Sequence, residues 1–164
     1  MPVEIVSVLG RARGVTAVRR WLQARGCARA GIFPWLANPL GYALVANEEN
    51  LIHDPGDMQI FMSRGVYFAN RNAPITIGKG AWIGPNVGLI TQNHDPADPA
   101  RHLPPEPIVL GEHCWIGMNA VILPGVVLGP YTTVGAGAVV TRSFPEGHCV
   151  IAGNPARLLR RLPG

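Results

Sequence analysis

Charged residues are scarce in this 164-residue chain: 15% are Asp, Glu, Lys or Arg, whereas 48% are hydrophobic. That balance excludes an intrinsically disordered protein, and the length fits one domain. No apolar run approaches the roughly 18 residues of a membrane-spanning helix. The three cysteines are odd in number and lack a metal-type spacing. We therefore expect Cys114 to be a reduced core residue, no metal site, and a cytoplasmic location.

Lysine is nearly absent, since Lys79 is the only one and the other basic residues are arginines. The formal net charge is +4, and most arginines lie near the two ends of the chain. A basic protein favours anionic partners. No nucleic-acid-binding motif is present and no aromatic residues alternate with the basic ones. We therefore expect a phosphorylated cofactor, an anionic glycan or a membrane surface nearby rather than nucleic acid.

A repeat of six residues is the strongest pattern in the chain. Aliphatic residues recur at the first position of each unit: Ile77, Ile83, Leu89, Leu110, Ile116, Ile122, Leu128, Val134 and Val140. The next residue is usually glycine: Gly78, Gly84, Gly111, Gly117, Gly129 and Gly135. The residue four places after each aliphatic is small or β-branched: Ala81, Val87, Cys114, Ala120, Val126, Thr132 and Ala138. A fixed period of this kind is typical of a solenoid, and neither a helix nor an alternating strand reproduces it.

The spacing predicts an all-β solenoid with parallel strands. Each unit turns one aliphatic and one small side chain toward the axis, and glycine fits the corner, where positive φ or a close backbone contact would penalise a Cβ. Three units close one triangular coil, so residues 77–94, 110–127 and 128–145 should form three stacked coils. Stacking buries the aliphatic column continuously. A sandwich of short strands would instead show turn signals every 8–12 residues or so.

The two ends of the chain differ from the repeat. Residues 1–58 are expected to form a helical and irregular segment that packs on the prism. Its arginine-rich start could also be a transit peptide or a helix that associates with a membrane surface. The solenoid should cover residues 59–152, with an irregular first coil and a bulged corner at 68–72. Residues 153–164 should form a short basic helix that caps the open end.

The repeat is interrupted after Leu89. Asn93 occupies a position that should be small, and residues 94–109 form an insertion rich in proline. A long loop without secondary structure in a compact domain is usually functional or disordered. Proline makes this one stiff, so we expect an ordered arm that reaches a neighbouring subunit.

Several motifs together resemble one known family. They are the six-residue units, Asn93-His94-Asp95-Pro96, Cys114-Trp115-Ile116-Gly117, Val134-Gly135-Ala136-Gly137 and Ala152-Gly153-Asn154-Pro155-Ala156-Arg157. The chain resembles the left-handed β-helix acyltransferases, in particular the branch of galactoside, maltose and nodulation-factor O-acetyltransferases. The resemblance implies a left-handed β-helix, a homotrimer with active sites between subunits, and transfer of an acetyl group from acetyl-CoA.

The resemblance also implies roles for particular residues. His94 would be the catalytic base, because an acceptor hydroxyl needs help to lose its proton and a neutral histidine can take it. The acceptor would contact Asn70, Asn72 and Trp115. The sugar branch has a small hydroxyl residue where this chain has Met118, so only the backbone N–H of Met118 can serve there. The residues expected to bind the CoA arm and its phosphates are Gly117, Met118, Gly135, Ala136, Gly137, Thr141, Arg142, Arg157 and Arg160.

The predicted activity is O-acetylation of a sugar or polysaccharide hydroxyl. N-acetylation of an aminosugar or an antibiotic would use the same histidine and stays open. A non-catalytic β-helix scaffold would have no reason to keep His94 together with the long insertion. A γ-class carbonic anhydrase shares the prism, but it needs three zinc-binding histidines at a spacing that is absent here.

Overall fold

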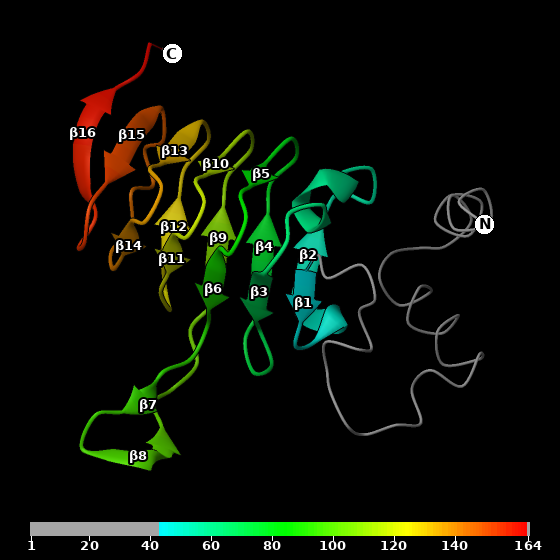
Figure 1. Ribbon diagram of the computed structural model, residues 1–164, viewed down its shortest axis with the longest axis vertical. Helices are drawn as coiled ribbons and strands as arrows, with labels where there is room; N and C mark the ends of the chain where they lie inside the picture. Colours follow the sequence, from blue (N-terminus) through cyan, green and yellow to red (C-terminus); the bar gives the residue numbers. More distant parts are fainter. Residues whose placement is uncertain (1–42, 164) are drawn as a thin grey trace, which may run out of the picture. The chain divides into compact units, whose positions relative to one another are not determined.

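Short parallel strands stack along one axis to form a β-helix (Figure 1). The computed structural model describes residues 43–163, so the helix expected within residues 1–30 lies outside the described residues. The first sheet contains β1 (Ala43–Val45), β3 (Val66–Ala69), β6 (Gly88–Ile90), β11 (Val121–Ile122) and β14 (Val139–Val140). The second contains β2 (Leu51–His53), β4 (Ile75–Ile77), β9 (Ile108–Leu110) and β12 (Val127–Leu128). The third contains β5 (Trp82–Ile83), β10 (Trp115–Ile116), β13 (Thr132–Val134), β15 (Cys149–Ala152) and β16 (Arg157–Arg161).

The six-residue repeat positions the core as predicted. In the first sheet Ile122 is in register with Leu89 on one side and Val140 on the other, and all three side chains are fully buried. Each buried side chain of this size contributes roughly 1.5–3 kcal/mol to folding. Cys114, at a predicted inward position, is buried and free of any disulfide. The aliphatic column is therefore the continuous core of the solenoid.

Glycine has two separate roles in the coils. A Cβ on Gly111, directly after an aliphatic, would lie 2.6 Å from the backbone nitrogen of Pro130 in the next coil, so close stacking requires glycine there. Positive φ occurs two residues later in the unit, for example at Gly137 (φ 70°), Asn86 (φ 57°) and Asn119 (φ 59°). Asparagine tolerates this conformation better than most residues. The glycine after each aliphatic therefore reflects contact between coils rather than backbone conformation.

The solenoid begins earlier than residue 59. Val45 in β1 is in parallel register with Phe68 in β3, and His53 in β2 is in register with Ile77 in β4. Residues 43–58 are therefore a further coil, not an irregular segment packed on the prism. The prediction missed this coil because its equivalent positions, Val45 and His53, are eight residues apart instead of six. The only helical turns in the described residues are two 3₁₀ turns, η1 (Glu48–Asn50) and η2 (Met58–Phe61), and no segment of residues 43–163 forms a helix with the length and hydropathy of a membrane span.

The predicted C-terminal helix is wrong. β16 runs antiparallel to β15, with Ala152 opposite Arg157 and Cys149 opposite Arg161. A strand satisfies the backbone groups along the edge of β15, which a helix at this end would leave unpaired. The cap is therefore a strand that extends the third sheet.

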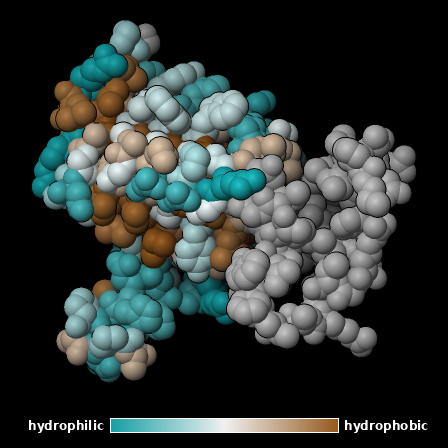
Figure 2. All heavy atoms as spheres, viewed as in Figure 1, coloured by the Kyte–Doolittle hydropathy of each residue, from teal (hydrophilic) through white to brown (hydrophobic). Residues whose placement is uncertain are grey.

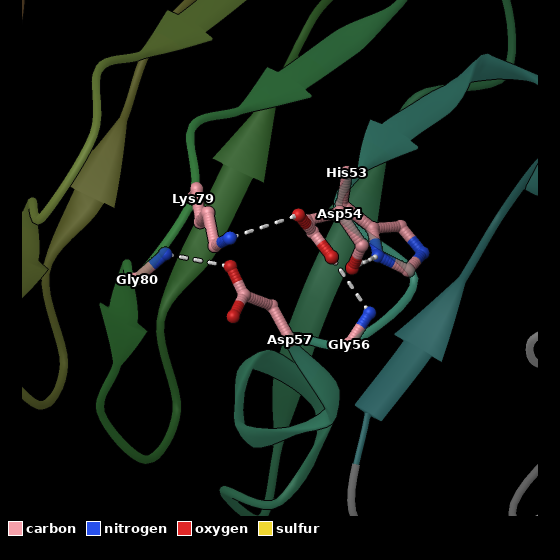
Figure 3. A network of polar contacts seen from close by, with 6 residues as sticks. All are labelled: His53, Asp54, Gly56, Asp57, Lys79 and Gly80. Carbon is pink, nitrogen blue, oxygen red and sulfur yellow. Dashed lines mark hydrogen bonds and ion pairs between the residues drawn. The ribbon is translucent and has the colours of Figure 1, made fainter.

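A polar network joins the coil of residues 43–58 to the next coil, at Lys79 and Gly80 (Figure 3). The backbone N–H of Gly80 donates to Oδ2 of Asp57 at 2.6 Å, and Lys79 lies 3.9 Å from Asp54. The hydrogen bond from Gln59 and then that from Gly80 lower the pKa of the Asp57 carboxyl, outweighing the opposite effect of burial. The ionised carboxylate of Asp57 therefore stabilises the contact between these coils.

Asp57→Asn is expected to lower the free energy of unfolding by about 1 kcal/mol at neutral pH. Because the folded-state pKa of Asp57 is lowered, its contribution is present above the unfolded-state value of about 3.9 and is lost as the pH falls through the folded value. Denaturant unfolding of both proteins at several pH values measures this difference. Glu49→Gln, at an exposed position, is the control. An equal difference at pH 7 and at pH 2 would contradict this role of the carboxylate.

Candidate active site

His94 lies at the start of a hairpin that projects from the solenoid (Figure 1). The hairpin consists of β7 (His94–Asp95) and β8 (Asp98–His102), which pair antiparallel. Nδ1 of His94 lies 2.7 Å from the carbonyl oxygen of Pro99. A carbonyl oxygen can only accept, so Nδ1 carries a hydrogen, and in the neutral imidazole Nε2 keeps its lone pair. The exposed His94 side chain therefore presents a nitrogen that can accept a proton.

The sequence predicted an ordered arm without secondary structure, whereas the insertion contains the two paired strands β7 and β8. Within the hairpin, Arg101 forms an ion pair with Asp95 at 2.9 Å. At its base, the backbone N–H of Leu103 donates to the carbonyl of Asn93 at 2.9 Å, and that of Glu106 donates to the carbonyl of Thr91 at 2.8 Å. Figure 2 shows that this projecting part of the surface is mainly hydrophilic. These contacts hold His94 in place relative to the first sheet.

A pocket of about 310 Å³ lies beside His94. The lining residues with polar groups are Tyr67, Arg71, Asn72, Thr91, Gln92, His94 and His102. The ring of His102 lies 4.1 Å from the ring of His94, centroid to centroid, because these residues are opposite each other in β7 and β8. The sequence analysis missed His102 as a pocket residue. Only the pairing of the two strands brings it to His94, and the sequence did not predict those strands.

The two predicted acceptor-binding asparagines have different environments. Asn72 lines the pocket and donates from Nδ2 to Gln92 Oε1 at 2.6 Å. Asn70 is fully buried and does not line it. Its side chain donates to the carbonyl of Asn47 at 2.6 Å and accepts from the Asn47 N–H at 3.0 Å. Asn70 therefore joins two coils, and Asn72 is the asparagine available to a ligand.

Trp115 is placed on a different sheet from the pocket. It lies in β10 of the third sheet, is 57% exposed, and is in register with the exposed Trp82 of β5. His94, in contrast, follows β6 of the first sheet. Within one chain the structure therefore does not bring Trp115 into the pocket with His94.

The residues predicted to bind the CoA arm form stacked turns after β10 and β13. The N–H of Gly137 donates to the carbonyl of Met118 at 2.9 Å, and the N–H of Gly117 donates to the carbonyl of Val134 at 2.8 Å. Ala136, Gly137 and Met118 are exposed, whereas Gly117 is buried and Gly135 is half-buried. A Cβ on Gly117 would lie 2.7 Å from the nitrogen of Ala136, so coil stacking explains this glycine without a ligand. The turns nevertheless expose two small residues, Ala136 and Gly137, beside the larger Met118.

The four residues predicted to contact the CoA phosphates are all exposed: Thr141, Arg142, Arg157 and Arg160. Arg142 lies over the ring of Phe144, 5.1 Å from its centroid, and Arg157 and Arg160 lie in β16. Within residues 43–163, none of these three arginines forms an ion pair with a carboxylate. They are therefore available to an anionic ligand. Residues 43–163 contain no group of three or more His, Cys, Asp or Glu side chains that could hold a metal ion.

Comparison with known proteins gives the class of the fold. The model of the bacterial transferase hexapeptide family, described as six repeats, matches residues 107–142. A hexapeptide-repeat acetyltransferase from Vibrio cholerae, solved in complex with acetyl coenzyme A, is 26% identical and superposes with a TM-score of 0.58. That superposition covers 94% of this chain and 92% of the other. The fold is therefore the left-handed parallel β-helix of hexapeptide-repeat proteins.

Several curated proteins that match part of this chain are named acetyltransferases. Nodulation protein L of Rhizobium meliloti is 47% identical over 90 residues, which cover 52% of this chain and 48% of that protein. Galactoside O-acetyltransferase of Escherichia coli is 36% identical over 109 residues, which cover 58% of this chain and 51% of the other. The chain spans about half the length of the curated relatives it matches. The matched part of the chain is therefore similar to hexapeptide-repeat acetyltransferases, as the resemblance implied.

Proposed function

We propose that the protein is an acetyl-CoA-dependent O-acetyltransferase that modifies a hydroxyl group of a sugar or polysaccharide, with His94 as the general base. The observation that carries this proposal is the hydrogen bond from Nδ1 of His94 to Pro99 at 2.7 Å, which leaves Nε2 able to accept a proton beside a pocket. The names of the relatives, galactoside O-acetyltransferase among them, support the reaction class. The acetyl-CoA complex of the similar Vibrio cholerae protein supports the donor.

The chemistry follows from the position of that nitrogen. Acetyl-CoA supplies a thioester that is already activated, so the chain needs to contribute only proton transfer and positioning. Nε2 of His94 accepts the proton of the acceptor hydroxyl as its oxygen attacks the thioester carbonyl carbon. His94 then returns the proton to the sulfur as the carbon–sulfur bond breaks. Histidine ends the reaction in its starting form, and no covalent enzyme intermediate is required.

We further propose that the complete site forms between subunits of a homotrimer. The pocket with His94 and the surface with Trp115 lie on different sheets of one chain. A neighbouring copy could present its Trp115, its stacked turns and its unpaired arginines to the hairpin of the first. In this arrangement Met118, Gly135, Ala136 and Gly137 would lie along the CoA arm, with Gly117 beneath them. Thr141, Arg142, Arg157 and Arg160 would contact the CoA phosphates, to which the guanidinium fork is suited.

Calorimetric titration of the purified protein with acetyl-CoA, together with its mass in solution, tests the donor and the assembly. We expect micromolar binding to a particle of three chains, and subsequent transfer of labelled acetyl to hydroxyl groups in a panel of sugars and aminosugars. Transfer only to amino groups would replace O-acetylation by N-acetylation. A folded trimer that does not bind acetyl-CoA would overturn the proposal and favour a scaffold.

A further inference from the structure

Arg71 is the one guanidinium group that lines the pocket beside His94. Its side chain is exposed and forms no ion pair or hydrogen bond with the described residues 43–163. An exposed guanidinium keeps its positive charge and its planar set of N–H donors available, and this geometry matches an anionic group. Arg71 therefore offers a free cationic group to whatever occupies the pocket.

The backbone around Arg71 is held in place by the preceding coil. Asn50 donates from Nδ2 to the carbonyl of Arg71 at 3.1 Å and to that of Asn70 at 3.0 Å. Asn47 also donates from Nδ2 to the Arg71 carbonyl, at 3.4 Å. Beneath them, the buried side chain of Asn70 pairs with the backbone of Asn47. These bonds make the corner that carries Arg71 a rigid part of the pocket wall.

No carboxylate lines the pocket to balance this charge. The other lining residues with polar groups are tyrosine, asparagine, threonine, glutamine and the two histidines. Asp95, the neighbour of His94 in the chain, is already paired with Arg101 at 2.9 Å. Among residues 43–163, the pocket therefore has one guanidinium surrounded by hydrogen-bonding groups, with no lining carboxylate to balance its charge.

We propose that Arg71 makes this pocket select an acceptor sugar that carries an anionic group, a carboxylate or a phosphate, near the hydroxyl to be acetylated. The guanidinium binds either group through two parallel hydrogen bonds, while His94 faces the hydroxyl on the same ligand. This inference rests on the proposed function for the acetylation step, but the recognition of the anion does not depend on it.

The test compares a neutral methyl hexoside, the matching methyl uronide and the matching hexose phosphate as acceptors. We expect kcat/KM of the native protein to be about 10-fold to 100-fold higher for one of the anionic acceptors, the range of a charge-assisted hydrogen-bonded pair. Arg71→Gln should abolish that preference, lowering kcat/KM for the anionic acceptor toward the value for the neutral sugar, without loss of acetyl-CoA affinity. A preference for the uronide would indicate a carboxylate as the natural anionic group, and a preference for the hexose phosphate would indicate a phosphate.

Arg64→Gln, at an exposed arginine that does not line the pocket, is the matched control and should keep the preference. Equal kcat/KM for charged and neutral acceptors in the native protein would overturn the inference. A loss of acetyl-CoA affinity in Arg71→Gln would also overturn it, by assigning Arg71 to the donor. Calorimetric binding of the uronide and the phosphate provides a readout that does not need turnover. If an anionic sugar binds through Arg71 but acetyl-CoA does not bind, the proposed function fails and the inference stands. If acetyl-CoA binds but neither anionic sugar does, only the inference fails.

Discussion

Replacing His94 with asparagine is expected to lower kcat by about 100-fold or more, the size of a typical general-base contribution. Asparagine can still donate a hydrogen bond toward the carbonyl of Pro99, which accepts from His94 at 2.7 Å. It has no nitrogen that can accept a proton at neutral pH. The affinity for acetyl-CoA and the mass in solution should stay unchanged, because His94 lies in an exposed hairpin outside the core. Steady-state kinetics and calorimetry on the same preparations measure these quantities.

His113→Asn is the matched control for that experiment. His113 is also an exposed histidine, but its ring stacks on Tyr131 at 4.9 Å and it does not line the pocket. Its replacement should leave kcat within about twofold of the native value, well below the general-base effect. If His94→Asn retained native kcat, His94 would not be the base. Equal losses in both variants would indicate general damage to the fold rather than loss of a base.

Gly111→Ala is expected to destabilise the protein by about 1–3 kcal/mol, the usual cost of inserting a methyl group into a packed site. The added Cβ would lie 2.6 Å from the nitrogen of Pro130 and 2.7 Å from the carbonyl carbon of Gly129, both backbone atoms that cannot rotate away. The two coils would have to separate locally, which would weaken the hydrogen bond from Gly111 N–H to the carbonyl of Leu128. Denaturant unfolding measures the change in free energy.

Gly137→Asn is the control, at a glycine position that requires positive φ but has room for a side chain. Gly137 has φ 70° and no atom within 4 Å of an added Cβ. Asn86 and Asn119 occupy the same phase of the repeat with φ 57° and 59°. We therefore expect a change of about 0.5 kcal/mol or less, in the range of ordinary surface substitutions. A larger cost at Gly137 than at Gly111 would contradict the assignment of the two glycine roles.

The sequence by itself determined the regular part of the fold and the catalytic candidate. The repeat from Ile77 to Val140 predicted which side chains are buried, because a parallel solenoid places equivalent positions in register and every coil repeats the same local requirement. His94 was identified by its position where the repeat stops and by the resemblance of the motif around it. Its role as base stays a prediction until it is tested.

Only the tertiary structure decided which residues surround His94. His102 reaches His94 by antiparallel pairing, Asn72 rather than Asn70 faces the pocket, and Arg71 is held there by Asn47 and Asn50. The first coil and the terminal strand β16 were likewise missed. The physical reason is common to all of these features. Each depends on hydrogen bonds between segments that do not follow the six-residue period. The local sequence therefore contains no pattern from which this pairing can be predicted.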